Sequence, residues 1–130
     1  MAVGTNFADF LLDELAPLGD VRVRRMFGGA GVYCGGLMFG LVARHTLYFR
    51  VDEVNRPAFQ AEACEPFSYE GRGRSVQLPY WRVPARLFED QAEMVEWARA
   101  ALLAAQRAAG KRHLRATPRR RGKRGLTGAG

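Results

Sequence analysis

Apolar residues recur at helical spacing near the start of the chain. Their spacing of i, i+3, i+4, i+8 and i+11 predicts an amphipathic helix over about residues 6–16. Thr5 or Asn6 is suited to cap its first turn, and Pro17 with Gly19 ends it. The apolar positions are Phe7, Phe10, Leu11, Leu15 and Leu18.

An alternating pattern interrupted by glycines follows, and it indicates β-structure. Residues 21–24 alternate, and residues 32–34 resume the pattern after a glycine-rich kink. Gly35-Gly36 then separates two apolar runs, which favours a hairpin turn because such turns need positive φ angles. The pattern predicts a meander of three antiparallel strands, the second over residues 37–42 and the third over residues 47–51.

The second half of the chain predicts a short helix and another hairpin. Asn55 is suited to cap the helix, with Pro57 in its first turn, where the missing N–H costs nothing. Residues 67–70 alternate as a strand, and residues 75–78 pair back across the loop Gly71-Arg72-Gly73-Arg74.

A helix over about residues 91–108 is the strongest periodic element. Asp90 and Glu93 match a capping box at its start, and Gly110 ends it. Its apolar stripe is broad and consists of small residues, which suggests burial on more than one side, with a partner subunit as one candidate. The stripe is formed by Val95, Ala98, Leu102, Ala105 and Ala109.

These elements define the expected fold. The order α-β-β-β-α-β-β-α, with five antiparallel strands and helices on one face, predicts an α+β two-layer sandwich. We expect one domain over residues 1–110. Residues 111–130 lack apolar periodicity and contain Pro118 and four glycines, so we predict a disordered tail there.

Charge divides the chain at the same boundary. The net charge is +7, but residues 1–110 carry twelve arginines against thirteen acidic residues. The tail carries eight cations and no acid. Such a tail predicts salt-dependent, sequence-independent contact with DNA or RNA, while a merely solvated tail explains it equally well. The cations are Lys111, Arg112, Arg115, Arg119, Arg120, Arg121, Lys123 and Arg124.

The cellular compartment is predicted from what the chain lacks. No apolar run is long enough to span a bilayer, and the first residues have neither the basic nor the apolar part of an export signal. We therefore expect a cytoplasmic protein without membrane contact. Cys34 and Cys64 form no CxxC pair and are interpreted as free, packed thiols.

The sequence offers no catalytic or metal-binding pattern. His45 falls in a predicted turn and His113 in the tail, and neither has a recognisable partner for acid–base work. No zinc-ligand or dinucleotide fingerprint is present. We therefore predict a protein that is not an enzyme and holds no metal or cofactor.

Two glycine-rich stretches invite a phosphate-binding interpretation. Residues 28–31 are followed by a strand and by no lysine, which favours a β-bulge or tight corner over a phosphate loop. In the second stretch Arg72 and Arg74 are spaced by glycines, so they can grip an anion, although a solvated hairpin tip is the preferred interpretation.

Several motifs, in order, resemble the N-terminal domain of the TfoX (Sxy) competence regulators. Over about residues 6–108 they are Arg24-Arg25-Met26-Phe27-Gly28-Gly29, Gly31-Val32-Tyr33, Gly36-Leu37-Met38-Phe39, Leu47-Tyr48-Phe49-Arg50-Val51-Asp52, Arg56-Pro57 with Phe59, Glu65 to Gly71 with Gly73-Arg74, Tyr80-Trp81 and Glu96-Trp97-Ala98.

The resemblance implies a fold like that of type III secretion chaperones, with a homodimer as one candidate assembly. The full-length regulators have a second, helical domain and act with the cyclic-AMP receptor protein to switch on DNA-uptake genes. This chain departs from them, since only the basic tail is expected after residue 110. The family supplies no catalytic residues to transfer.

Two functional hypotheses result. The first is a regulatory or adaptor domain that acts on transcription through protein contacts, with nucleic-acid affinity added by the tail. The second is a small-molecule or peptide-binding module whose pocket combines arginines and aromatic residues. The candidate contact residues are Arg24, Arg25, Phe27, Arg72, Arg74 and Trp81, with Tyr48 as a further pocket residue.

Overall fold

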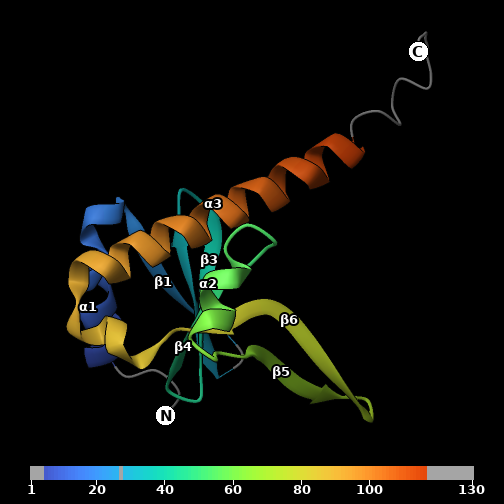
Figure 1. Ribbon diagram of the computed structural model, residues 1–130, viewed down its shortest axis with the longest axis horizontal. Coiled ribbons are helices and arrows are strands. Elements are labelled where there is room, and N and C mark those ends of the chain that lie inside the picture. The colour runs from blue at the N-terminus through green and yellow to red at the C-terminus, as the bar shows by residue number, and fades with distance from the viewer. Residues whose placement is uncertain (1–4, 27, 117–130) are drawn as a thin grey trace, which may run out of the picture.

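The computed structural model describes residues 5–26 and 28–116. It contains one six-stranded antiparallel sheet, in the order β1-β2-β3-β4-β6-β5, and three α-helices (Figure 1). The elements are α1 (Thr5–Glu14), β1 (Val21–Met26), β2 (Gly29–Cys34), β3 (Leu37–Ala43), β4 (Thr46–Arg50), α2 (Arg56–Ala61), β5 (Pro66–Gly71), β6 (Arg74–Arg82) and α3 (Gln91–Ala116), with 3-10 turns at Ala16–Leu18 and Ala85–Glu89.

The predicted α+β fold is confirmed, but the predicted strand count is wrong. The first expected strand is two strands, β1 and β2, which pair as a hairpin from Val21↔Cys34 to Met26↔Gly29. Gly28 takes a φ of 78° where the chain reverses. The order is therefore α-β-β-β-β-α-β-β-α. The likeness to type III secretion chaperones stays a prediction.

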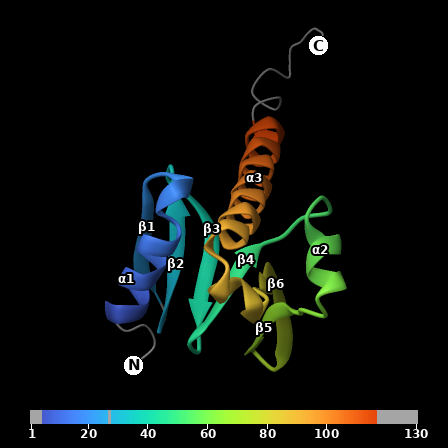
Figure 2. The ribbon, with the colours of Figure 1, turned by 60° about the vertical axis from the view of Figure 1, so that its left-hand side comes forward.

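One face of the sheet carries the hydrophobic core. Figure 2 shows α1 and α3 on the same side of the strands, and the strands that α3 contacts most are β3 and β4. The largest buried residues of the core include Leu11, Phe39, Phe49, Phe59 and Met94, each of which is at most 1% exposed to solvent. All three helices therefore bury apolar residues in one cluster on this face.

A bulge in β3 sets which residues face that core. Val32 pairs with Gly40 and Tyr33 pairs with Met38, so Phe39 is an extra residue in β3. A Cβ at Gly40 would lie 3.1 Å from the Val32 side chain, which places Gly40 tightly against the core. Beyond the bulge the regular alternation resumes, so Leu41 and Val42 face opposite sides of the sheet.

Helix α3 is longer than predicted. It continues through Gly110 to Ala116, so Lys111, Arg112 and Arg115 are helical rather than part of a disordered tail. Its small stripe packs against the rest of the same chain, with Ala98 fully inaccessible to solvent and Ala105 only 4% exposed. No helix in the described ranges is long and apolar enough to cross a membrane. The remaining predicted tail cations, Arg119, Arg120, Arg121, Lys123 and Arg124, lie outside the described residues.

Only one of the two hydrogen bonds of the predicted capping box forms at the start of α3. The Glu93 N–H donates to Asp90 Oδ1 over 3.1 Å, as the motif requires. The Glu93 carboxylate accepts from Arg86 instead of from Asp90, and Arg86 also donates to Glu62 at 2.6 Å. This exposed network holds the end of α2 to the start of α3.

The junction between β4 and α3 is fixed by polar groups. The buried side chain of Asn55 accepts from the Asp52 N–H at 2.8 Å and donates to the Arg50 carbonyl at 3.0 Å. Asn55 lies at the predicted cap position, although its side chain makes no cap hydrogen bond. Arg107 of α3 donates two hydrogen bonds, of 2.6 and 2.9 Å, to the Asp52 carboxylate.

We expect Asp52→Asn to lower the free energy of unfolding at neutral pH by on the order of 1 kcal/mol, because the pair is partly exposed and screened by water. The hydrogen bonds from Arg107 lower the pKa of the Asp52 carboxyl to about 2. A lowered pKa stabilises the fold above the unfolded-state pKa of about 4, and this stabilisation is lost as the pH falls below it.

Urea denaturation of both proteins at a series of pH values measures this effect. The difference between wild type and variant should shrink below about pH 4. Asp20→Asn, which removes an exposed pair with Arg22, is the matched control and should change stability by less than about 0.5 kcal/mol. A difference for Asp52→Asn that persists unchanged in acid would contradict the assignment.

Candidate functional site

The sheet face opposite the helices carries the candidate site, and we call it the open face. Directly paired residues of antiparallel strands project to the same side, and the pairs Tyr33↔Met38 and Leu41↔Tyr48 extend this face across β2, β3 and β4. The helices pack on the other side. The open face is thus apolar and aromatic, although no helix of the described residues covers it.

Each of the three cation–π pairs in the described chain involves an arginine over a ring of this face. Their guanidinium-to-ring distances are between 5.5 and 5.9 Å, within the range of attraction. The planar cation shields the ring while its charge stays at the surface. The pairs are Arg24 with Tyr33, Arg44 with Phe67 and Arg50 with Tyr80.

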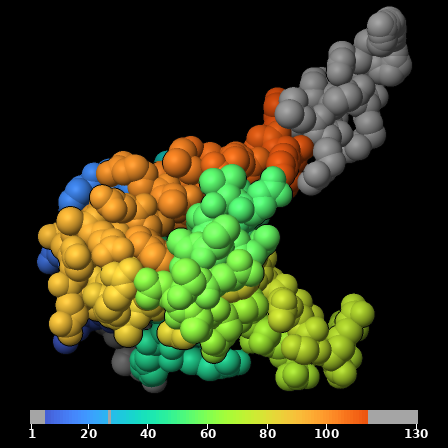
Figure 3. All heavy atoms as spheres, viewed as in Figure 1, coloured from blue at the N-terminus to red at the C-terminus, as the bar shows by residue number. Residues whose placement is uncertain are grey.

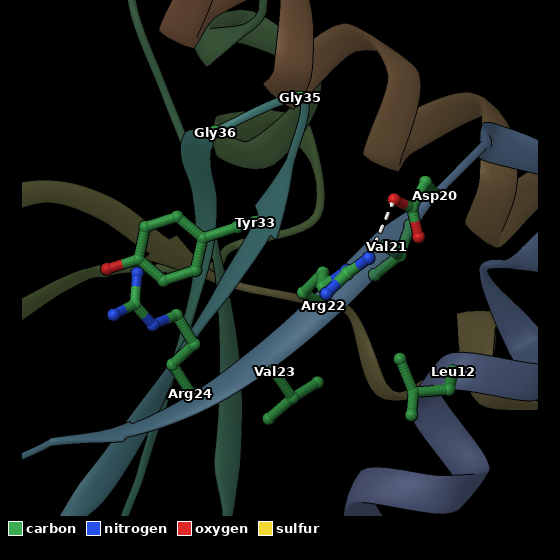
Figure 4. Close-up of a pocket in the computed structure, with 9 residues that line it drawn as sticks. All are labelled: Leu12, Asp20, Val21, Arg22, Val23, Arg24, Tyr33, Gly35 and Gly36. Atoms are coloured by element: carbon green, nitrogen blue, oxygen red, sulfur yellow. Dashed lines mark hydrogen bonds and ion pairs between the residues drawn. The ribbon is translucent and has the colours of Figure 1, made fainter.

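The first pair lies at the edge of the sheet. Figure 4 shows the Arg24 guanidinium beside the Tyr33 ring, while Arg22 turns toward Asp20 and forms a 3.3 Å ion pair. A shallow hollow of about 710 Å³ runs along β1 here, with Leu12 on its far side. Exposed arginines on an edge strand also hinder pairing with other chains.

A second, more apolar hollow of about 620 Å³ lies on the open face between β3 and the β5–β6 hairpin. The Phe67 ring contacts two other aromatic rings. Its centroid lies 5.0 Å from the Tyr48 centroid and 6.3 Å from the Tyr69 centroid. The hollow combines flexible thioethers, rings and one arginine. It is lined by Met26, Gly28, Gly29, Met38, Leu41, Val42, Ala43, Arg44, Phe67, Tyr69 and Leu78.

The glycines of the first hairpin allow this packing. A Cβ at Gly31 would lie 2.8 Å from the Tyr33 ring and 3.0 Å from Met26 and Met38. A Cβ at Gly29 would overlap the carbonyl oxygen of Val42. These positions serve a tight turn and close contact between strands, as expected from the preference for a corner over a phosphate loop.

The predicted contact residues do not form one pocket. Arg24 and Arg25 lie on β1, whereas Arg72 and Arg74 are exposed at the β5–β6 turn, and β2, β3 and β4 separate these two edges of the sheet. Figure 1 shows that hairpin projecting from the body of the molecule. The predicted pocket that combined these arginines with aromatic residues therefore does not form, because the arginines lie at two separate edges of the sheet.

Two of the remaining predicted residues also lie on different faces of the sheet. Trp81 packs on the core side, with its ring 6.4 Å from Phe59. Tyr48 lies on the open face beside Phe67. Phe27 lies outside the described residues. Arg72 and Gly73 have φ angles of 53° and 80°, which are those of a tight two-residue hairpin.

The described residues contain no group of three metal-ligating side chains drawn from His, Cys, Asp and Glu. His45 is exposed in a turn with a φ of 65°. Both cysteines are free, and burial raises the pKa of the Cys64 thiol.

Comparison with known proteins identifies similar sequences. The family model of the TfoX N-terminal domain matches residues 13–105, from α1 into α3. The chain is also similar to Protein Sxy of Escherichia coli (strain K12), with 30% identity over 103 residues. The match covers 79% of this chain and 49% of the relative, so the chain spans about half the length of that protein.

The two glycines predict a graded response to alanine. Gly29→Ala should lower the free energy of unfolding by about 3 kcal/mol, because the new methyl group meets backbone that cannot move without separating β2 from β3. Gly31→Ala meets only the ends of flexible side chains and should cost about 1 kcal/mol.

Thermal and urea denaturation measure both values. Gly110→Ala is the control, since its Cβ meets open space on α3 and the change should stabilise the protein by about 0.5–1 kcal/mol. Equal losses at Gly29 and Gly31 would show that the contact with the Val42 backbone is not the cause.

Proposed function

The chain belongs to the TfoX N-terminal domain family, and from this membership we propose that it is a non-enzymatic regulatory or adaptor domain. It acts in transcriptional regulation through protein contacts, and its basic C-terminal segment adds affinity for DNA or RNA. We place its action in the cytoplasm.

The open face is the observation that carries this proposal. Met26, Met38, Phe67 and Tyr69 line its hollow, with Arg44 at the rim. Aromatic residues, methionine and arginine are the types enriched at protein–protein interfaces. Methionine also adapts its shape to a partner. An apolar hollow bordered by cations suits a partner segment that combines an apolar side chain with nearby carboxylates.

We propose a transcription factor of the cyclic-AMP receptor type as the partner, on the basis of family membership. A homodimer formed through the same face is the competing assembly. The two differ in the mass of the complex, which sedimentation measures for the protein alone and for the mixture.

The open face can be tested with exposed residues, so that folding is preserved. Arg24→Glu and Tyr69→Ser should each weaken binding to such a transcription factor by about tenfold, since anchors of this kind cost more than about 1 kcal/mol when removed. Arg99→Glu and Leu103→Ser make the same changes at exposed positions of α3. Isothermal titration calorimetry with purified proteins supplies the affinities.

The controls should bind within about twofold of wild type. If the open-face variants also bind normally, the face is not the contact surface. If both pairs lose binding, the contact extends over α3. A transcription reporter run with the same four variants links binding to regulation.

The basic segment predicts salt-dependent binding to duplex DNA. Removal of residues 117–130 deletes five cations but leaves α3 to its described end. The slope of log affinity against log salt should fall by up to about 4.5, because each neutralised phosphate contributes about 0.9. Fluorescence anisotropy at several salt concentrations measures it. An unchanged slope after truncation would show that the segment is merely solvated.

The alternative is a module that binds a small molecule or peptide. It is favoured by the hollow of about 620 Å³ between β3 and the β5–β6 hairpin, in place of the pocket expected from Arg72, Arg74 and Trp81. Binding of an apolar fluorescent dye that Tyr69→Ser abolishes, with normal binding of the transcription factor, would support this alternative.

A further inference from the structure

A small cleft lies where the end of β4 meets the C-terminal half of α3. Figure 3 shows the segment after β4, in green, against the orange-red part of α3. The cleft has a volume of about 280 Å³. Its lining residues come from two elements far apart in sequence: Arg50, Asp52, Ala104, Arg107, Ala108, Lys111 and Arg112.

The lining carries four cations and a single carboxylate. Arg107 engages that carboxylate, Asp52, through two hydrogen bonds of 2.6 and 2.9 Å. Arg50, Lys111 and Arg112 then have no acidic partner among the residues that line the cleft. Cations held close together repel one another unless an anion lies between them.

Arg50 supplies the most specific observation. Its Nε is the one buried side-chain nitrogen or oxygen without a hydrogen-bond partner in the described part of the chain. Its backbone is held by Asn55 and its guanidinium lies 5.6 Å from the Tyr80 ring centroid. Buried donors are normally satisfied, so the unpartnered Nε needs an explanation such as an ordered water. Because the Nε is closed to solvent, a ligand in the cleft would meet other atoms of Arg50, which lines the cleft.

The opposite wall leaves space for a ligand. Ala104 and Ala108 are one helical turn apart and so lie on the same side of α3. Their methyl groups do not fill the cleft, while Lys111 and Arg112 follow on the next turn. The cations therefore converge on an open volume from two directions, unlike a run of charges along one exposed helix face.

We propose that this cleft binds a phosphate group. Phosphate oxygens accept several charge-assisted hydrogen bonds at once, and arginine matches them with parallel donors. The phosphate belongs either to a nucleic-acid backbone or to a free nucleotide or phosphate. The backbone source rests on the proposed nucleic-acid affinity, whereas the site itself does not.

The test uses the full chain and two probes, inorganic phosphate and duplex DNA. Phosphate titrated at constant ionic strength, with chloride as reference, should shift the amide NMR signals of Arg50, Ala108 and Arg112. Arg50→Gln with Arg112→Gln should weaken this binding at least about tenfold. Lys111→Gln with Arg112→Gln alters only exposed residues and should weaken it in the same direction.

Arg56→Gln with Arg99→Gln is the matched control, because it removes two exposed charges away from the cleft. It should bind phosphate like wild type. For DNA, the cleft variants should lower the salt slope by about 1, in addition to the loss caused by truncation after residue 116.

The outcomes separate the site from the proposed function. Phosphate shifts in the cleft without DNA binding support the site and overturn the nucleic-acid part of the function. DNA binding that depends on residues 117–130, without cleft shifts and with unaffected cleft variants, overturns the site and leaves the function standing. Equal losses in the control and the cleft variants also overturn the site.

Discussion

One-sided burial of the sheet is the constraint on which the rest of the structure depends. All three helices place their apolar residues in a single cluster on one face. An antiparallel sheet tolerates such asymmetry, but the second face then meets water and is usually polar. Here that face carries methionines and rings. Arginines lie over the rings of Tyr33, Phe67 and Tyr80, so the side chains that shield these rings from water also give the face its charge.

The local parts of this fold were predictable from sequence because their signals are local. The start of α3 follows from Asp90 and Glu93, whose backbone hydrogen bond forms as the motif requires. The turns at residues 35–36 and 71–74 follow from Gly35, Gly36 and Gly73, which take positive φ. In each case a few neighbouring residues determine the backbone without help from distant contacts.

The errors have physical causes. An alternating pattern of apolar and polar residues is the same whether the strand continues through a kink or the chain reverses. The sequence therefore predicts one strand where the structure has β1 and β2. Gly110 costs a helix only about 1 kcal/mol, and its long helical surroundings carry α3 past it. The place of Met38 in the candidate site is not predictable from sequence, because the bulge at Phe39 changes which residues of β3 share a face. The alternating pattern of the sequence cannot reveal the extra residue in β3, because only the pairing of β3 with β2 shows that a residue is extra.

Tyr80 connects the two surfaces for which binding is proposed. Its O–H donates to the Met38 carbonyl at 3.3 Å, and Met38 lines the apolar hollow of the open face. Burial raises the pKa of the Tyr80 hydroxyl, and a tyrosine hydroxyl is a donor at neutral pH even at its ordinary pKa of about 10. The Arg50 guanidinium lies over the same ring and lines the cationic cleft. A protein contact on the open face and a phosphate in the cleft would therefore be held in a fixed relation by one buried ring, as an adaptor between a protein and a nucleic acid requires.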